Sequence, residues 1–220
     1  MASDMKLLIF ANGRPNDGPM VRLNLEQAPD AYILAADGGA RVAYYFGLRA
    51  QTVIGDMDSL TADEVRQLEE RNVEILRHVP EKDQSDLELA LMLAAERGFD
   101  WIRIIGGLGG RFDQMLANAY LLALPQLVER DVALIAGKQY ICLLRPGTHQ
   151  VTGDVGDTIS LLPISGTVTG ITTTGLQYPL RNEALYFGPA RGISNVMLAD
   201  TATIALQNGN LLLIHTKGRA

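Results

Sequence analysis

The segment Gly55-Asp56-Met57-Asp58-Ser59 places two carboxylates one residue apart, a spacing suited to binding a cation. In an extended chain, Asp56 and Asp58 point to the same side, where their charges repel each other. Magnesium relieves this repulsion, because it prefers a few carboxylates together with water and phosphate oxygens. The alternative is that Asp58 or Ser59 only forms a turn or caps the next helix. Further aspartates follow neighbouring predicted strands, so we favour a magnesium site that handles phosphates.

A second group of charged residues is formed by Lys82, Asp83 and Asp86. The two aspartates are three positions apart, so the first turn of a helix brings them near one face. Carboxylates also suit the positive end of a helix dipole, which by itself explains them without any function. In the functional interpretation, one carboxylate is a metal ligand or general base, and Lys82 contacts a phosphate.

A third group is the glycine-rich segment from Gly106 to Asp113, which reads GGLGGRFD. Glycine lets backbone amides approach an anion closely, and a helix beginning near Phe112 directs its free amides to the same place. Arg111 adds a possible bidentate phosphate contact. The segment is neither a P-loop nor a dinucleotide-binding fingerprint. A structural turn accounts for one or two glycines more easily than for four.

Apolar runs typical of strands alternate with amphipathic stretches typical of helices along the first ~135 residues, and these elements position the three groups. Thr61 and Glu64 have the spacing of a helix capping box, and Ser85 and Glu88 repeat that spacing. This alternation predicts a parallel sheet covered on both faces by helices, with ligands bound beyond the carboxyl ends of the strands. The predicted strands are 6–11, 31–36, 52–54, 101–105 and 132–136, with a further apolar stretch at 73–79, and the predicted helices are 62–71, 87–97 and 112–122.

After about residue 137 the helical periodicity ends, and short strand-like runs predict an antiparallel sandwich or barrel. Asn208-Gly209 predicts a tight hairpin between the last two strands. The loop from Arg191 to Asn195 either recognises a polar ligand or forms a turn. The predicted strands are 140–144, 158–162, 167–173, 201–206 and 211–215.

The composition of the chain narrows the classes of function. Its 220 residues carry a formal net charge of −6, which disfavours a nucleic-acid partner. No apolar run approaches the length of a membrane span, so no membrane partner is expected. Cys142 is the single cysteine, and the first residues lack the pattern of a signal peptide. We therefore expect a cytoplasmic protein.

Taken in order, five motifs resemble those of the thiamine pyrophosphokinase family. The resemblance implies an α/β nucleotide-binding domain over 1–137, followed by a β-sandwich over 138–220 that binds thiamine. It also implies a homodimer with the thiamine pocket at the interface. The implied reaction transfers the pyrophosphoryl group of ATP to the hydroxyl of thiamine, giving thiamine diphosphate and AMP. The motifs are 36–39 (ADGG), 55–59 (GDMDS), 82–88 (KDQSDLE), 106–114 (GGLGGRFDQ) and 192–195 (GISN).

The resemblance also implies roles for individual residues. The expected catalytic residues, which also bind Mg²⁺, are Asp56, Asp58, Asp83 and Asp86. The expected contacts to ATP and its phosphates are Asn12, Asp37, Gly38, Lys82, Gly107, Gly110, Arg111, Asp113 and Gln114. Ser194 and Asn195 are expected in the thiamine pocket. Many bacterial members have histidine at the position of Gln114, and the last strand here lacks the tryptophan that some members stack on thiamine.

Two other functions are compatible with the motifs. A magnesium-dependent phosphohydrolase uses an aspartate nucleophile in an Asp-x-Asp loop and does not need ATP. A non-catalytic nucleotide sensor binds its ligand without forming product. The sequence also does not decide whether Asp83 or Asp86 is the general base.

Overall fold

The computed structural model describes residues 5–79 and 83–219. The chain forms two compact units, Met1–Gly137 and Lys138–Ala220. Within the described residues, no helix combines the length and the apolar character needed to span a bilayer.

The first unit contains a six-stranded parallel sheet with the order β6-β5-β1-β2-β3-β4. The prediction of a parallel sheet is therefore confirmed, with strand ends that differ by one or a few residues. The strands are β1 (Lys6–Phe10), β2 (Tyr32–Ala36), β3 (Thr52–Gly55), β4 (Glu74–Arg77), β5 (Trp101–Ile105) and β6 (Asp131–Ala136).

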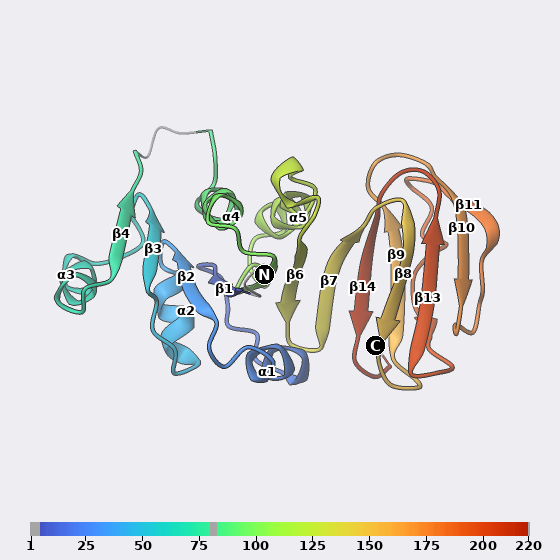
Figure 1. Ribbon diagram of the computed structural model, residues 1–220, viewed down its shortest axis with the longest axis horizontal. Helices are drawn as coiled ribbons and strands as arrows, with labels where there is room; N and C mark the ends of the chain where they lie inside the picture. Colours follow the sequence, from blue (N-terminus) through green and yellow to red (C-terminus); the bar gives the residue numbers. More distant parts are fainter. Residues whose placement is uncertain (1–4, 80–82, 220) are drawn as a thin grey trace. The chain divides into compact units, whose positions relative to one another are not determined.

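Helices cover both faces of this sheet, with α1 and α2 on one face and α4 and α5 on the other (Figure 1). The predicted capping box is present at α3, and Ser85 caps α4 by accepting a hydrogen bond from the backbone N–H of Glu88. Helices α1 and α2, which begin without a side-chain cap, were not predicted from the sequence. The helices are α1 (Pro19–Glu26), α2 (Gly39–Tyr45), α3 (Ala62–Glu70), α4 (Asp86–Glu96), α5 (Phe112–Leu121) and the 3₁₀ turn η1 (Pro125–Leu127).

The order of the strands reverses at β1, which pairs with β2 on one side and with β5 on the other. The connections after β1 and β5 lead to helices on opposite faces of the sheet (Figure 1). In open α/β sheets such a reversal leaves a crevice beyond the carboxyl ends of the strands, where ligands bind. The topology therefore places the ends of β1 and β5 at the expected position of a ligand site.

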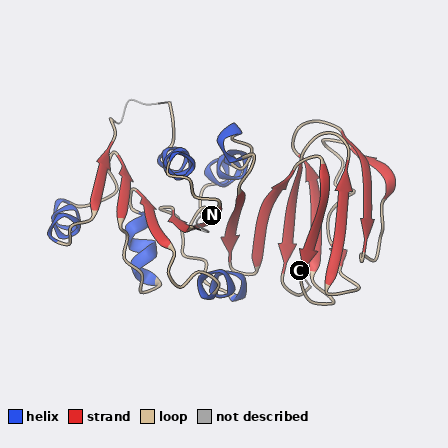
Figure 2. Cartoon of the chain, viewed as in Figure 1, coloured by secondary structure: helices blue, strands red, loops and turns tan. Residues whose placement is uncertain are grey.

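The second unit is a sandwich of two antiparallel sheets, with the orders β12-β9-β14-β7 and β11-β10-β13-β8. Figure 2 shows its described part as strands joined by loops. Both sheets contribute to one apolar core, for example through Leu161 and Leu213 from one and Ile171 and Ile204 from the other. The strands are β7 (Gln139–Leu144), β8 (Gly147–Thr152), β9 (Thr158–Pro163), β10 (Val168–Thr174), β11 (Arg181–Leu185), β12 (Asn195–Val196), β13 (Thr201–Leu206) and β14 (Leu211–Thr216).

The predicted hairpin at Asn208-Gly209 is wrong. β13 pairs with β8 and β10, whereas β14 pairs with β7 and β9, so the turn carries the chain from one sheet to the other. The backbone groups of the turn bond elsewhere: Asn208 donates to the carbonyl of Thr169, and Asn210 donates to Oγ of Ser165. Contacts distant in the sequence thus override the local preference of Asn-Gly for a hairpin.

Candidate active site

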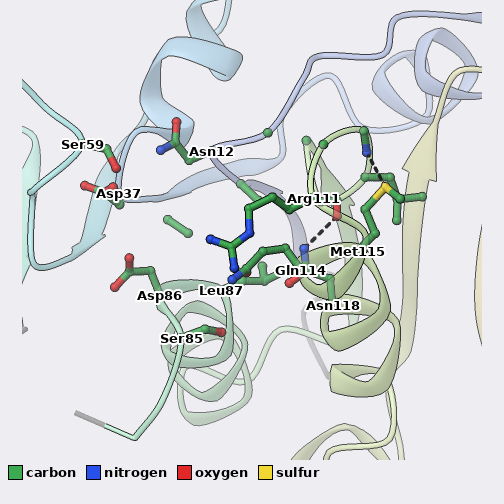
Figure 3. Close-up of a pocket in the computed structure, with 18 of the residues that line it drawn as sticks. Asn12, Asp37, Ser59, Ser85, Asp86, Leu87, Arg111, Gln114, Met115 and Asn118 are labelled. Atoms are coloured by element: carbon green, nitrogen blue, oxygen red, sulfur yellow. Dashed lines mark hydrogen bonds between the residues drawn. The ribbon is translucent and has the colours of Figure 1, made fainter. Parts of the chain in front are cut away.

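A cleft with a volume of about 920 Å³ lies in the first unit, beyond the carboxyl ends of β1, β2, β3 and β5. Figure 3 shows Asp37, Ser59 and Asp86 on one side, Gln114, Met115 and Asn118 on the other, and Arg111 reaching between them. The lining residues are 11–14, 36–37, 56, 58–59, 84–87, 106–111, 114–115 and 118.

Three carboxylates form an acidic wall in this cleft. Asp37, Asp56 and Asp58 each offer an oxygen within 4.8 Å of the others. Asp37 is only 3% exposed, and its Oδ1 has no hydrogen-bond partner among the described residues. Burying a carboxylate oxygen without a partner is costly, and neighbouring negative charges add to that cost. A bound cation would offset both effects.

The chain around Asp56 and Asp58 forms a turn, so the extended conformation assumed from the sequence is wrong. Met57 adopts a left-handed conformation (φ 66°) and buries its side chain. The backbone N–H of Asp58 donates to Oδ1 of Asp56 at 3.1 Å. The turn and the cluster of carboxylates, which the sequence presented as alternatives, therefore occur together in one segment.

Gly55 explains how the acidic wall is packed so closely. Its φ is +148°, and a Cβ at this position would lie 3.0 Å from Oδ1 of Asp86 and 3.1 Å from Cβ of Asp37. A side chain at residue 55 would therefore displace both aspartates. The glycine lets Asp86, the first residue of α4, approach the wall formed by Asp37, Asp56 and Asp58.

The opposite wall is the loop from Gly106 to Gly110, and side-chain amides hold two of its carbonyls. Asn118 donates to the carbonyl of Gly107 at 2.7 Å, and Asn16 donates to that of Leu108 at 2.8 Å. Gly106 (φ 80°) packs so closely that a Cβ would lie 2.3 Å from the carbonyl oxygen of Ala11. The loop is therefore fixed from three sides before any ligand binds.

Arg111 follows this loop, is largely exposed, and forms an ion pair with Asp113. The guanidinium of Arg111 lowers the pKa of Asp113 below its ordinary value of 3.8. Both residues stand at the start of α5, whose unpaired backbone amides carry partial positive charge. This end of the cleft is thus suited to an anion, in contrast to the acidic wall.

The structure brings most of the predicted residues of the first unit to one cleft. Among the described residues, Gly38, Asp83 and Asp113 do not line it, and Lys82 lies outside the described residues. Gly38 instead packs under Asn12, because a Cβ on Gly38 would lie 2.3 Å from the Asn12 side chain. The predicted residues that do line the cleft are Asn12, Asp37, Asp56, Asp58, Asp86, Gly107, Gly110, Arg111 and Gln114.

Several residues that line the cleft were not predicted from the sequence. Arg14 follows Asn12-Gly13 at the end of β1, so the same rule about strand ends identifies it. Asn118 lies four residues after Gln114 on α5, a spacing that brings the two to one face of the helix. Its contact with the Gly107 carbonyl is a tertiary feature that no local pattern predicts.

Ser194 and Asn195 lie in the second unit, where a smaller pocket of about 150 Å³ is lined by Tyr178, Arg191 and Asn195 among others. The side chain of Asn195 holds the backbone of Tyr178 through both of its polar atoms, at 2.8 and 3.0 Å. Ser194 is exposed and has a left-handed backbone (φ 57°), with its N–H donating to Oγ of Ser160. Asn195 thus shapes this loop, and Ser194 lies at its surface.

Family models match both units of the chain. The model described as "Thiamin pyrophosphokinase, catalytic domain" matches residues 24–134, and the one described as "Thiamin pyrophosphokinase, vitamin B1 binding domain" matches residues 148–211. The thiamine pyrophosphokinase of Bacillus subtilis (strain 168) is 32% identical over 184 residues, which cover 83% of this chain and 86% of the relative. The chain belongs to the thiamine pyrophosphokinase family.

Solved structures of thiamine pyrophosphokinases share its fold. The crystal structure of the Bacillus subtilis protein superposes with a TM-score of 0.85 at 30% identity, covering 96% of this chain and 99% of that one. The structure of a family protein from Enterococcus faecalis has a TM-score of 0.85 at 28% identity, covering 97% and 100%. The predicted fold class is confirmed, and the phosphohydrolase and the non-catalytic sensor receive no support from these matches.

Proposed function

We propose that the protein is a thiamine diphosphokinase, which transfers the pyrophosphoryl group of ATP to the hydroxyl of thiamine. The observation that carries this proposal is the cleft of the first unit, in a chain of the thiamine pyrophosphokinase family. One wall offers three clustered carboxylates, and the other offers a glycine-rich loop followed by Arg111. A site for a nucleotide with its cation needs both kinds of wall.

In the proposed reaction, the thiamine oxygen attacks the β-phosphorus of ATP, and the bond from that phosphorus to the oxygen of the α-phosphate breaks. AMP leaves, and the hydroxyl proton passes to a carboxylate. Asp86 lines the cleft, whereas Asp83 does not, so we assign proton acceptance to Asp86. Positioning and charge neutralisation supply most of the acceleration in such transfers.

We propose Asp37, Asp56 and Asp58 as the residues that hold Mg²⁺. The partnerless Oδ1 of Asp37 and the 4.8 Å grouping of the three carboxylates fit a hard divalent cation with oxygen ligands. When bound, the ion supplies positive charge to phosphate oxygens. Asp86 lies beside this group, across Gly55, whereas Asp83 is exposed and does not line the cleft.

The second unit is the proposed thiamine-binding domain, in accord with the description of its matching family model. Ser194 is proposed as a contact to thiamine and Asn195 as the residue that holds its loop.

We further propose a homodimer with this pocket at the interface, because Tyr178 and Ile193, which line the pocket, and Phe187 leave 65%, 46% and 68% of their surfaces exposed. Exposed apolar side chains in one region suit a protein interface. A cytoplasmic location is also proposed, since Cys142 is the single cysteine and the chain can form no internal disulfide, which suits a reducing compartment.

One assay tests the reaction directly. The protein is incubated with ATP, Mg²⁺ and thiamine, and AMP and thiamine diphosphate are quantified by chromatography. We expect the two products in equal amounts. Release of inorganic phosphate without thiamine diphosphate, or nucleotide binding without any product, would overturn the proposal.

Calorimetric titration tests the metal site independently of turnover. We expect Mg²⁺ to bind the wild-type protein, and an Asp37→Asn/Asp58→Asn variant to bind it much more weakly. Asp63→Asn serves as the control, because Asp63 lies in the first turn of α3 and does not line the cleft. Equal binding by all three proteins would contradict the assignment.

Light scattering tests the dimer. We expect a solution mass twice that of the 23.9 kDa chain, and a monomer for Phe187→Glu. A monomeric wild-type protein would refute the dimer and leave the chemistry of the cleft intact.

A further inference from the structure

We propose that Arg14 binds the phosphates of the nucleotide, an inference that rests on the proposed use of ATP in the cleft of the first unit. Arg14 follows β1, is exposed, and lines the cleft. Across residues 5–79 and 83–219, its side chain takes part in no hydrogen bond or ion pair. The guanidinium is therefore available to a ligand.

The charges around the cleft show why a positively charged side chain such as that of Arg14 is needed there. Asp37, Asp56, Asp58 and Asp86 all line it and would repel the phosphates of a nucleotide. The other arginine of the lining, Arg111, already pairs with Asp113. A guanidinium without a carboxylate partner offers its full fork of donors to phosphate oxygens. In the described lining, Arg14 is the arginine that meets this condition.

The backbone on both sides of Arg14 is anchored to the glycine-rich loop. On one side, Gly13 packs so closely that a Cβ would lie 2.2 Å from the carbonyl oxygen of Gly106. On the other, the Asn16 side chain donates to the carbonyl of Leu108 at 2.8 Å, and the Asn16 carbonyl accepts from Gly137 at 2.6 Å. These contacts keep the Cα of Arg14 beside the loop that offers amides to an anion.

The arrangement separates two tasks within one segment. Gly13 and Asn16 fix where the backbone runs, and the exposed Arg14 side chain stays free to adjust to the ligand. Arginine loses less freedom per hydrogen bond than lysine, because its planar fork is already arranged for two contacts. Arg14→Lys should therefore recover only part of the affinity that Arg14→Ala loses.

The test is equilibrium binding by calorimetry, with a non-hydrolysable ATP analogue plus Mg²⁺ and, separately, with adenosine. We expect Arg14→Ala to weaken binding of the analogue roughly 10- to 100-fold, the effect of losing a hydrogen bond to a charged group. Adenosine has no phosphate, so its affinity should change by no more than about twofold, as for a neutral surface substitution. Raising the salt concentration should reduce the difference in affinity for the analogue between the wild type and Arg14→Ala, because salt screens charge interactions.

Arg49→Ala is the matched control, because Arg49 is also an exposed arginine of the first unit but does not line the cleft. It should bind both ligands as the wild type does. Unchanged binding of the analogue by Arg14→Ala, or an equal loss for adenosine, overturns the proposal. These measurements involve neither thiamine nor turnover, so a protein that binds the analogue through Arg14 but forms no thiamine diphosphate would refute the proposed function alone.

Discussion

Two buried aspartates, one in each unit, have opposite surroundings. Asp157 is 2% exposed, and its oxygens accept hydrogen bonds from the backbone of Gly218 at 2.7 Å and Asp154 at 3.0 Å, with Nε2 of His215 at 2.6 Å. Asp37 is 3% exposed, yet its Oδ1 has no partner in the described part of the chain. The carboxylates grouped with it, those of Asp56 and Asp58, carry the same charge.

The difference is the one expected between a structural carboxylate, Asp157, and a proposed magnesium ligand, Asp37. Burial raises the pKa of Asp157, but its three hydrogen bonds outweigh burial and hold the pKa below its ordinary value of 3.8. The ionised form of Asp157 therefore stabilises the fold. By contrast, Oδ1 of Asp37 accepts no hydrogen bond from the described residues, and groups that cost stability persist where function requires them. Changing each aspartate to asparagine should consequently affect different properties of the protein.

The largest effect is expected for Asp58→Asn, which removes one charge from the proposed magnesium site. Turnover should fall roughly 100- to 1,000-fold, the usual result of losing one electrostatic contact to the transition state. Steady-state formation of thiamine diphosphate measures this fall. Asp58 is exposed, so circular dichroism and the unfolding midpoint should not change. Turnover near that of the wild type would remove Asp58 from the metal site.

Asp37→Asn should lower turnover by about 100-fold, at the lower end of the same range. Without Mg²⁺, its unfolding midpoint should be equal to or higher than that of the wild type, because one of three mutually repelling charges is gone. Differential scanning calorimetry with and without Mg²⁺ checks this expectation. A marked loss of stability would show that Asp37 is structural, like Asp157, and that the two aspartates do not differ in role.

Asp157→Asn is the matched substitution in the second unit, and it should act on stability instead. An amide cannot accept every hydrogen bond that the carboxylate accepts, so the free energy of unfolding should fall by about 1–3 kcal/mol. Urea denaturation measures the change, and kcat measured on fully folded protein should stay close to that of the wild type. A large drop in kcat with unchanged stability would assign Asp157 to the chemistry.

The smallest expected effect is on the pH dependence of stability, to which Asp157 contributes one part. Because its pKa is lower in the folded protein, its stabilisation is complete above the ordinary value of 3.8 and is lost as the pH falls through the folded value. Between neutral pH and about pH 3, the wild type should therefore lose more stability than Asp157→Asn. Parallel loss in both proteins would show that other groups control acid unfolding.

The sequence alone allowed many of the elements of the first unit, and nine of the residues that line its cleft, to be predicted. Alternating apolar runs and helix caps at Thr61 and Ser85 are local signals, and they persist in the folded protein. Helices α1 and α2 lacked such caps and were missed. In the second unit, Asn208-Gly209 carried a strong local signal that the pairing of β13 and β14 with different sheets overruled.

The sequence also determined which chemical groups stand at the ends of the strands, because a parallel sheet brings those ends to one edge whatever the details of packing. Only the tertiary structure decided which carboxylates meet. It placed Asp37 with Asp56 and Asp58, left Asp83 outside the cleft, and turned the chain at Met57 where an extended segment was expected. The reason is physical: spacing along the chain sets the direction of a side chain only within one element. Whether a carboxylate is buried and paired depends on backbone and side chains far away in the sequence, as Gly55 shows for Asp86 and His215 for Asp157.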